Sequence, residues 1–320
     1  MKTFHGFFPD GTDYDESNFA KVAAESFQAE LLTIGLSPQQ FIEDIPTLIW
    51  AMDEPAAGPG IFPQYRVSKM AAGHVKVVLG GQGGDELFGG YTFRYKKFLQ
   101  LTNNNSTTEE KIISYLNCHE RDWVPDQELI FSDECKFSWN EIHEKIRPYF
   151  SNSLSNFTQV LLADYNGKLL HNMQPLYSLI HKHFGVTNIT PIQNNETIRL
   201  SCQLTDSLKY DFSTNTGKIP LVDLIEKYGL TNLISQEKQG FSVNTVNMWS
   251  SYGQKIFLHY FDKSRLTEDK ILNSDWIQKY SNKSNLDVRY VNKLLGILAL
   301  EIWYRLFIIK DLHADEKLTI

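Results

Sequence analysis

Hydrophobic and polar positions alternate in blocks along the first 90 residues, and these blocks predict strands that alternate with helices. The aromatic run KTFHGFF at 2–8 is strand-like, and the turn residues PDGTDYDES separate it from an amphipathic run at 18–30. A short apolar strand at 31–34 precedes a helix at 38–52, which starts with proline, a residue suited to the first helical turn. The order strand, helix, strand, helix indicates parallel strands.

The same pattern continues with one more helix and one more strand. Residues 64–72 are predicted as a helix, and VKVVLGG at 75–81 is predicted as a strand. The predicted strand at 75–81 is apolar at most positions, a pattern typical of a strand that is buried on both faces of a sheet. The fold class is therefore predicted as α/β, with a doubly wound parallel sheet.

The chain changes character after Tyr91, where helical periodicity becomes dominant. The polar tract TNNNSTTEE at 102–110 is interpreted as a surface loop, and the sequence has no internal repeat. We therefore divide the chain into an α/β part at 1–100 and a mainly helical remainder at 101–320.

Composition excludes several classes of protein. The 320 residues are 42% hydrophobic and can fill a core, while a net charge of -7 without a basic block argues against partners such as duplex nucleic acid or a membrane surface. Cys118, Cys135 and Cys202 lie far apart, so we expect no disulfide framework or paired-cysteine metal site, and a reducing, cytoplasmic location. The sequence has neither an apolar run of the roughly 18 to 20 residues that span a membrane nor a signal-peptide pattern at its start.

The segment VVLGGQGGDELFGGY at 77–91 combines a strand end with glycines and carboxylates. Its first four glycines are Gly80, Gly81, Gly83 and Gly84. Glycines at the carboxyl end of a parallel strand let the backbone approach a ligand, which is where open α/β sheets bind nucleotides. Asp85 follows, and a carboxylate there is better suited to hold Mg²⁺ than to contact phosphate, which it would repel. The alternative is a glycine-rich turn with an aspartate that caps a helix.

The whole string GGQGGDELFGGY resembles the signature of glutamine-dependent asparagine synthetases, which reads SGEGxDExFGGY or GGxGGDExFGGY. Further segments follow in that family's order: TFHGFF, YDESNFAKVAA, LIWAMDEPAAGPGIFPQYRVSKMAA, GKIPLVDLIEKYGL and ISQEKQGFSVNTVNMW. The resemblance is close as far as Tyr91 and looser to about residue 250. It implies that 1–100 form part of a nucleotide-binding fold of the adenine-nucleotide alpha hydrolase-like, PP-loop ATP pyrophosphatase type.

In this family ATP activates the side-chain carboxylate of aspartate as an acyl-adenylate, and ammonia then gives asparagine, AMP and pyrophosphate. The resemblance thus implies ATP and Mg²⁺ as cofactors, with aspartate and ammonia as substrates. By position, the residues that match nucleotide contacts are Gly80, Gly81, Gly83, Gly84, His5 and Gly6, and Asp85 matches the Mg²⁺ ligand. Gln82 matches a position, often glutamate, near aspartate and the intermediate, where an amide can hydrogen-bond but cannot act as a carboxylate base.

Two lysines match basic positions of the family. Lys218 in GKIPL matches the lysine that stabilises the adenylation transition state, and Lys238 in EKQGF matches a second basic position near pyrophosphate. Exposed loop lysines are the alternative for both. His181 and His183 have no flanking ligands, so we interpret them as a solvated helix end rather than a metal site.

The sequence also departs from the family. The string SGGxDS, which cradles pyrophosphate and supplies a second Mg²⁺ ligand after the first, central strand, does not occur, and the glutaminase with its terminal cysteine is missing before MKT. At 185–195 the chain reads GVTNITPIQNN where the family usually shows ExRxPFLD, so Pro191 is kept while Asn188 and Asn194 replace charged residues.

We therefore expect the synthetase region of an asparagine synthetase, incomplete at its N-terminal strand and inactive as an isolated chain. Ammonia would come from glutamine through a glutaminase domain elsewhere, and an upstream polypeptide would carry SGGxDS. Two alternatives stay open. One is another adenylating amide ligase or amidotransferase of the same fold, such as a β-lactam synthetase, and the other is a non-catalytic remnant or subunit.

Overall fold

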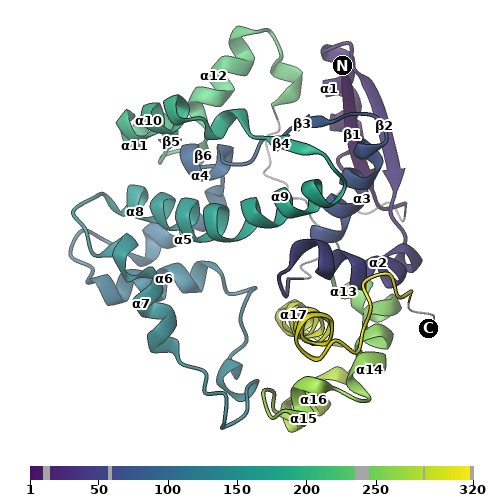
Figure 1. The fold of residues 1–320 in the computed structure, drawn as a ribbon. Coiled ribbons are helices and arrows are strands. Elements are labelled where there is room, and N and C mark those ends of the chain that lie inside the picture. Colours follow the sequence, from purple (N-terminus) through teal and green to yellow (C-terminus); the bar gives the residue numbers. More distant parts are fainter. Residues whose placement is uncertain (10–14, 57–59, 235–244, 284, 318–320) are drawn as a thin grey trace.

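The computed structural model describes residues 1–9, 15–56, 60–234, 245–283 and 285–317, and everything below refers to these residues. Strands and helices alternate near the N-terminus, and helices dominate the rest of the chain (Figure 1). This arrangement confirms the predicted α/β class. No helix in the described part combines the length and apolar character needed to cross a bilayer.

The elements at 1–91 lie close to their predicted positions. They are β1 (Lys2–Phe7), α1 (Ser17–Ser26), β2 (Glu30–Gly35), α2 (Pro38–Met52), α3 (Ile61–Ala72), β3 (Val77–Leu79) and α4 (Gly84–Phe88). Helix α2 starts where its sequence directs it, because the Ser37 hydroxyl accepts a bond from the Gln40 N–H while the Gln40 side chain accepts one from the Ser37 N–H.

The remaining elements are mostly helical. The first group comprises α5 (Thr92–Leu101), α6 (Thr108–Cys118), η1 (Gln127–Leu129), α7 (Trp139–Phe150), α8 (Asn156–Ala163), the π-helical segment η2 (Asp164–Met173), α9 (Gln174–His183), β4 (Thr187–Ile189), η3 (Pro191–Gln193) and α10 (Asn195–Gln203). The second comprises α11 (Asp206–Lys209), β5 (Tyr210–Asp211), β6 (Thr216–Gly217), α12 (Ile219–Lys227), η4 (Thr231–Leu233), α13 (Thr245–Met248), η5 (Trp249–Gly253), α14 (Gln254–Phe261), α15 (Arg265–Glu268), α16 (Ser274–Ser281), α17 (Val288–Tyr304) and η6 (Arg305–Ile309).

The polar tract at 102–110 is only partly the surface loop that its composition predicts. Thr107 caps α6: its hydroxyl accepts a bond from the Glu110 N–H, and the Glu110 carboxylate accepts one from the Thr107 N–H. The last residues of the tract therefore start a helix, because a threonine followed three positions later by glutamate forms a capping box.

The strands form separate pairs. Strand β1 pairs in parallel with β2, β3 pairs in parallel with β4, and β5 and β6 form an antiparallel hairpin. No described strand connects these pairs, so a single doubly wound sheet is not confirmed. Val77 and Leu79 of β3 are 49% and 69% exposed. The prediction that this strand is buried on both faces is therefore wrong, because a two-stranded pair lacks the neighbours that would cover it.

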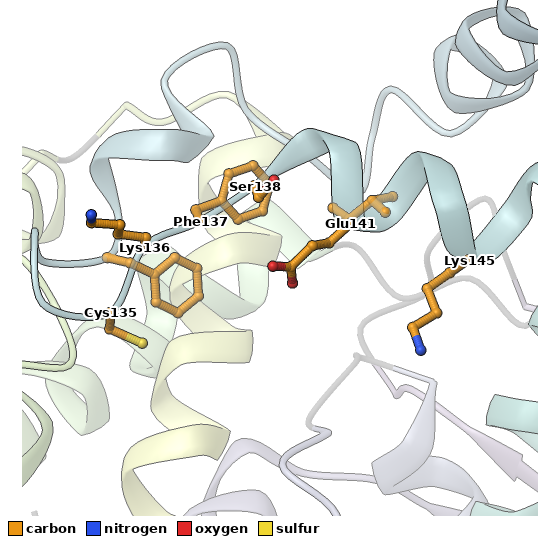
Figure 2. A pocket seen from close by; sticks show the side chains of 8 residues that line it. Cys135, Lys136, Phe137, Ser138, Glu141 and Lys145 are labelled. Carbon is orange, nitrogen blue, oxygen red and sulfur yellow. The ribbon is translucent and has the colours of Figure 1, made fainter.

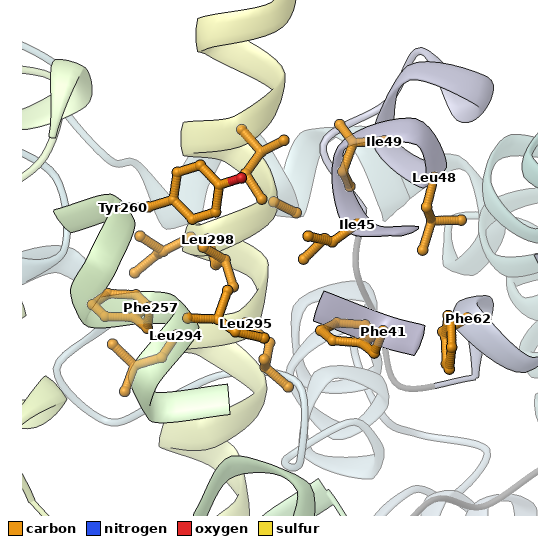
Figure 3. Packing of buried hydrophobic residues seen from close by; sticks show 14 of the residues in the cluster. Phe41, Ile45, Leu48, Ile49, Phe62, Phe257, Tyr260, Leu294, Leu295 and Leu298 are labelled. Carbon is orange, nitrogen blue, oxygen red and sulfur yellow. The ribbon is translucent and has the colours of Figure 1, made fainter. Parts of the chain in front are cut away.

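The main hydrophobic core joins helices from the two ends of the chain (Figure 3). Its fully buried side chains include Phe41, Ile45 and Leu48 of α2, Phe257 of α14, and Leu294, Leu295 and Leu298 of α17. A second cluster, which includes Tyr95, Phe98, Tyr115 and Phe157, packs α5, α6 and α8 together beneath the glycine motif. Most residues of both clusters lie on helices, although Tyr210 of β5 belongs to the second.

One carboxylate connects the loop after α6 to the C-terminal helices. Asp126 accepts hydrogen bonds from Trp276 Nε1 at 3.0 Å, from the Tyr280 hydroxyl at 2.6 Å and from the Tyr290 hydroxyl at 3.0 Å. Burial alone would raise the pKa of Asp126, but these three bonds outweigh it and lower the pKa. The carboxylate therefore stabilises the fold above its ordinary pKa, and this stabilisation is lost as the pH falls through the lowered value.

We expect Asp126→Ala to lower the free energy of unfolding at pH 7 by about 2 to 3 kcal/mol, because three donors lose an ionised acceptor. Urea unfolding followed by circular dichroism measures this loss, with Asp133→Ala at an exposed position as the control. The difference from wild type should shrink in acid. An Asp126 variant as stable as the control at pH 7 would show that these bonds contribute nothing.

Candidate functional site

The glycine motif forms a turn between β3 and α4, as its sequence predicts. The Gly80 N–H extends the parallel ladder by donating to the Ile189 carbonyl at 2.9 Å, and Gly83 then takes φ of 97° at the start of α4. A Cβ atom on Gly83 would lie 2.7 Å from Cγ of Gln193. The turn therefore requires glycine both for its left-handed backbone and for its close packing.

Asp85 and Lys218, which lie far apart in the sequence, meet at this turn. Lys218 Nζ lies 2.7 Å from Asp85 Oδ1. The lysine backbone is fixed as well, because its N–H donates to the Phe88 carbonyl at 2.7 Å and its φ is 58° at the start of α12. A non-glycine residue in this left-handed conformation costs about 1 to 3 kcal/mol and is often found at functional sites.

Glycines also make room for this ion pair. A Cβ on Gly90 would collide with the Asp85 carboxylate and the Lys218 stem, and a Cβ on Gly217 would collide with the Gly89 carbonyl. The FGGY end of the motif and the GK dipeptide of the GKIPL segment therefore fit each other sterically. Two segments singled out separately in the sequence form one site.

The Gln82 side chain is folded back toward the strand end beside Gly80. Its Oε1 atom is buried and has no hydrogen-bond partner within the described part of the chain, while its backbone carbonyl accepts a bond from Gln193 Nε2 at 3.1 Å. Asn188 of β4 also lies against Gly80. The divergent stretch at 185–195 thus packs on the motif and contributes neutral amides there.

The other predicted site residues lie elsewhere. His5 and Gly6 belong to β1, where His5 Nε2 lies 3.1 Å from the Ser17 hydroxyl and a Cβ on Gly6 would lie 2.9 Å from Cγ2 of Val67. Lys238 lies outside the described residues.

The interpretation of the histidines needs one correction. His181 is buried at the end of α9, and its Nδ1 lies 2.6 Å from the Tyr177 carbonyl, so it is not part of a solvated helix end. Burial lowers the pKa of this imidazole, which favours the neutral ring that packs there. Across the described ranges, no three His, Cys, Asp or Glu side chains gather as a metal site.

A buried layer of charged residues that the sequence did not single out lies beneath the motif. Segment η2, in the middle of the continuous run from α8 to α9, packs against α4. It carries Asp164, which is fully buried and accepts bonds from Arg94 Nη1 at 3.2 and 3.3 Å and from the Tyr115 hydroxyl at 2.8 Å. π-helical segments inside α-helices are frequent at functional sites.

Two cations of this layer lie over the ring of Tyr91, the last residue of the motif. Arg94 Cζ is 4.6 Å and Lys168 Nζ is 3.5 Å from the ring centroid. The Tyr91 hydroxyl donates to Glu86 Oε1 at 2.7 Å. Contacts between cations and an aromatic face are favourable, and more so when water is excluded.

Burial changes the protonation of this layer. Burial and then the positive charge of Arg94 lower the pKa of Lys168 to about 8, although Asp164, Glu86 and Asp85 oppose the change. Burial raises the pKa of Glu86 despite its bond from Tyr91. The four-residue spacing of Asp164 and Lys168 was a usable signal in the sequence, but the same spacing is common on solvent-facing helices.

An open pocket of about 300 Å³ lies elsewhere, at the start of α7 (Figure 2). It is lined by Phe131, Cys135, Lys136, Phe137, Ser138, Glu141, Ile142 and Lys145. None of the residues predicted to act in catalysis or nucleotide binding lines this pocket. The charged layer and the glycine turn therefore remain the candidate site.

A family model matches most of this chain, and individual known proteins match it over shorter stretches. A family model described as asparagine synthase matches residues 1–305. The glutamine-hydrolysing asparagine synthetase 1 of Bacillus subtilis (strain 168) is 39% identical over 102 residues, which are 32% of this chain and 16% of that protein. A provisionally named glutamine-hydrolysing asparagine synthetase of Mycobacterium tuberculosis (strain H37Rv) is 41% identical over 88 residues, 28% of this chain and 13% of that protein. The matched stretches thus span less than a fifth of these curated relatives.

We expect Asp164→Asn to lower the free energy of unfolding by about 3 to 5 kcal/mol, because it leaves the buried Arg94 charge without its partner. Burial raises the pKa of Asp164, but nearby His119 and Arg94 outweigh it and hold the pKa at about 2. The stabilisation should therefore be complete above the ordinary pKa near 4 and be lost as the pH falls towards 2.

Denaturant unfolding of wild type and Asp164→Asn between pH 2.5 and 7 tests this expectation. The exposed substitution Asp275→Asn is the matched control and should change the unfolding free energy little. A constant difference between wild type and Asp164→Asn across this pH range would contradict an ionised Asp164 in the folded protein.

Proposed function

Because this chain belongs to the asparagine synthase family, we propose that it forms the synthetase region of an enzyme that makes amides at the expense of ATP. The proposed reaction joins aspartate and ammonia to give asparagine, with AMP and pyrophosphate as the other products. The observation that carries this proposal is the contact of Asp85 with Lys218 at the glycine turn after β3. It places a carboxylate and an ammonium together where a parallel strand pair ends.

This pair suits the chemistry of adenylation. Asp85 would hold Mg²⁺, which supplies positive charge to the phosphates when it is bound. Lys218, released from Asp85 by that ion, would reach the phosphate oxygens with a backbone that is already fixed. A preorganised cation stabilises charge that develops in the transition state, because little reorganisation is needed at that moment.

The glycine turn supports the same proposal. Gly80, Gly81, Gly83 and Gly84 would let the nucleotide approach the backbone. The buried Oε1 of Gln82, which has no partner among the described residues, could accept a hydrogen bond from an N–H of the substrate. His5 and Gly6 on β1 would flank the adenine side. Lys238 is proposed as a second cation near pyrophosphate, although it lies outside the described residues.

We propose further that the α/β part at 1–100 is an incomplete fold of the PP-loop ATP pyrophosphatase type, and that 101–320 complete the synthetase domain. The separation of the β1·β2 and β3·β4 pairs supports a strand supplied by an upstream polypeptide that also carries SGGxDS. The exposure of Val77 and Leu79 supports it as well, since a neighbouring strand would cover apolar side chains of this kind. Ammonia would come from a glutaminase domain elsewhere.

One observation favours a different acid as the substrate. Asn188 and Gln193, from the stretch where the family usually carries charges, place neutral amides against the glycine turn. Measuring ATP–pyrophosphate exchange with a panel of acids separates the two assignments, because the physiological acid should support the fastest exchange. A fastest exchange with an acid other than aspartate would redirect the proposal to another amide ligase of this fold.

In an enzyme completed with the missing strand and loop, we expect Lys218→Met to lower the rate of aspartate-dependent ATP–pyrophosphate exchange by about 100-fold or more. The KM for ATP should change much less, because the lysine would act mainly in the transition state. Lys227→Met, at an exposed position of α12, is the control. A raised KM for ATP with unchanged turnover would move the catalytic role away from Lys218.

The 320 residues alone are expected to form no asparagine and no AMP at a rate typical of such an enzyme, since Asp85 alone would hold Mg²⁺ and pyrophosphate poorly. Co-expression with a polypeptide that contains the strand and SGGxDS should restore amide synthesis from ammonia. The measurement is AMP release with aspartate, ammonia and Mg·ATP. Rapid AMP release by the purified chain alone would falsify the proposal that the chain is incomplete.

A further inference from the structure

The ammonium of Lys168 lies in a half-buried position with few partners. It is 3.5 Å from the centroid of the Tyr91 ring, and within the described part of the chain it has no hydrogen bond and no ion pair. A half-buried charge without a hydrogen-bonding partner is unfavourable unless something else supplies one. Lys168 is therefore a cation that is available for an anionic ligand.

The carboxylates around Lys168 are already engaged. Asp164 is bound by Arg94 and Tyr115, Glu86 by Tyr91, and Asp85 by Lys218. The charged and titratable groups that face Lys168 are Asp164 on its own segment, Asp85 and Glu86 on α4, Tyr91 and Arg94 at the start of α5, and Asp122 after α6. Since these carboxylates have other partners, they do not prevent Lys168 from binding an anion.

Lys168 and Lys218 approach α4 from different elements. Figure 1 shows α4 between α12, which follows Lys218, and the helix run α8 to α9, which carries Lys168 in η2. Lys218 pairs with Asp85, the residue proposed to hold the metal of Mg·ATP, so the phosphates belong on that side. The stretch at 185–195 offers amides rather than cations at the turn. Lys238 is proposed for pyrophosphate, and Arg94 is bound to Asp164. Among the described cations beside α4, Lys168 is therefore the one that can pair with a second anionic group of the substrate.

We propose that Lys168 is a specificity-determining residue that binds the carboxylate of the acid substrate that is not activated by ATP. This inference rests on the proposed function and deepens it by naming a residue that would bind the second carboxylate of the substrate. For aspartate, the carboxylate in question is the one next to the amino group. Binding replaces a weak contact with an aromatic face by a charge-assisted hydrogen bond, so an acid that lacks this group gains less.

The protonation of Lys168 gives this proposal a direct readout. Its pKa, lowered to about 8, still leaves the ammonium predominant at pH 7, and a bound carboxylate would raise the pKa back towards its ordinary value. Acylation by acetic anhydride reports on the neutral amine of each lysine. A bound dicarboxylate should therefore slow the acylation of Lys168 and shift its titration to higher pH.

The test uses the full chain, acylated between pH 6 and 11 and analysed by mass spectrometry of its peptides. The probes are aspartate and β-alanine, which is aspartate without the carboxylate next to the amino group. Aspartate should slow the acylation of Lys168, and β-alanine should not. The exposed Lys96 should be acylated at the same rate whichever probe is present. Protection by Mg·ATP alone would assign Lys168 to phosphate and overturn the proposal, as would no protection by aspartate.

Variants separate binding from a merely structural role. Aspartate should raise the melting temperature of wild type, of Lys168→Arg and of the control Lys96→Gln. Lys168→Gln should bind aspartate about 10-fold to 100-fold more weakly, which is the loss expected for one charge-assisted bond. Equal aspartate binding by Lys168→Gln and wild type would overturn the inference. Protection of Lys218 by Mg·ATP, read by the same acylation method on the chain co-expressed with the polypeptide that carries SGGxDS, tests the proposed function separately.

Discussion

The contact between Asp85 and Lys218 constrains the backbone around it. It requires the end of α4 to approach the β5·β6 hairpin so closely that Gly90 and Gly217 cannot carry side chains. The hydrogen bond from the Lys218 N–H to the Phe88 carbonyl then fixes the lysine without relying on its flexible side chain. The glycines of the motif thus serve the ion pair as well as any approach to a nucleotide.

The charged layer below the motif depends on the helical cluster that surrounds it. Arg94 and Asp164 are held between α5, α6 and η2 by side chains such as Tyr95 and Tyr115. In this poorly solvated environment a charged side chain is held rigidly when it has an ionic partner, and it is destabilising when it has none. This layer beneath α4 in turn holds Tyr91 and Glu86 in place. Buried charged contacts, rather than an extended sheet, therefore position the site at the strand end.

The sequence predicted the elements at 1–91 well, because their periodicity and caps are local properties, as Ser37 and Gln40 illustrate. It could not predict the exposure of Val77 and Leu79, since burial of a strand depends on neighbours that its own pattern does not reveal. The resemblance to asparagine synthetases predicted that Asp85 and Lys218 belong to one site, and the structure places them in contact. Asp164 and Lys168 were missed because a charged pair on a helix is usually a solvent-facing feature.

The β1·β2 and β3·β4 pairs, which no described strand joins, are compatible with a folded chain where their unpaired backbone groups can bind water. A buried backbone group without a partner would cost about 1 to 3 kcal/mol, whereas an exposed group can bind solvent. The main core, in which α2 packs with α14 and α17, is complete without a continuous sheet (Figure 3). Val77 and Leu79 of β3 are exposed apolar side chains, and an exposed strand with such side chains favours pairing with another strand. The helical body can therefore be stable without a continuous sheet.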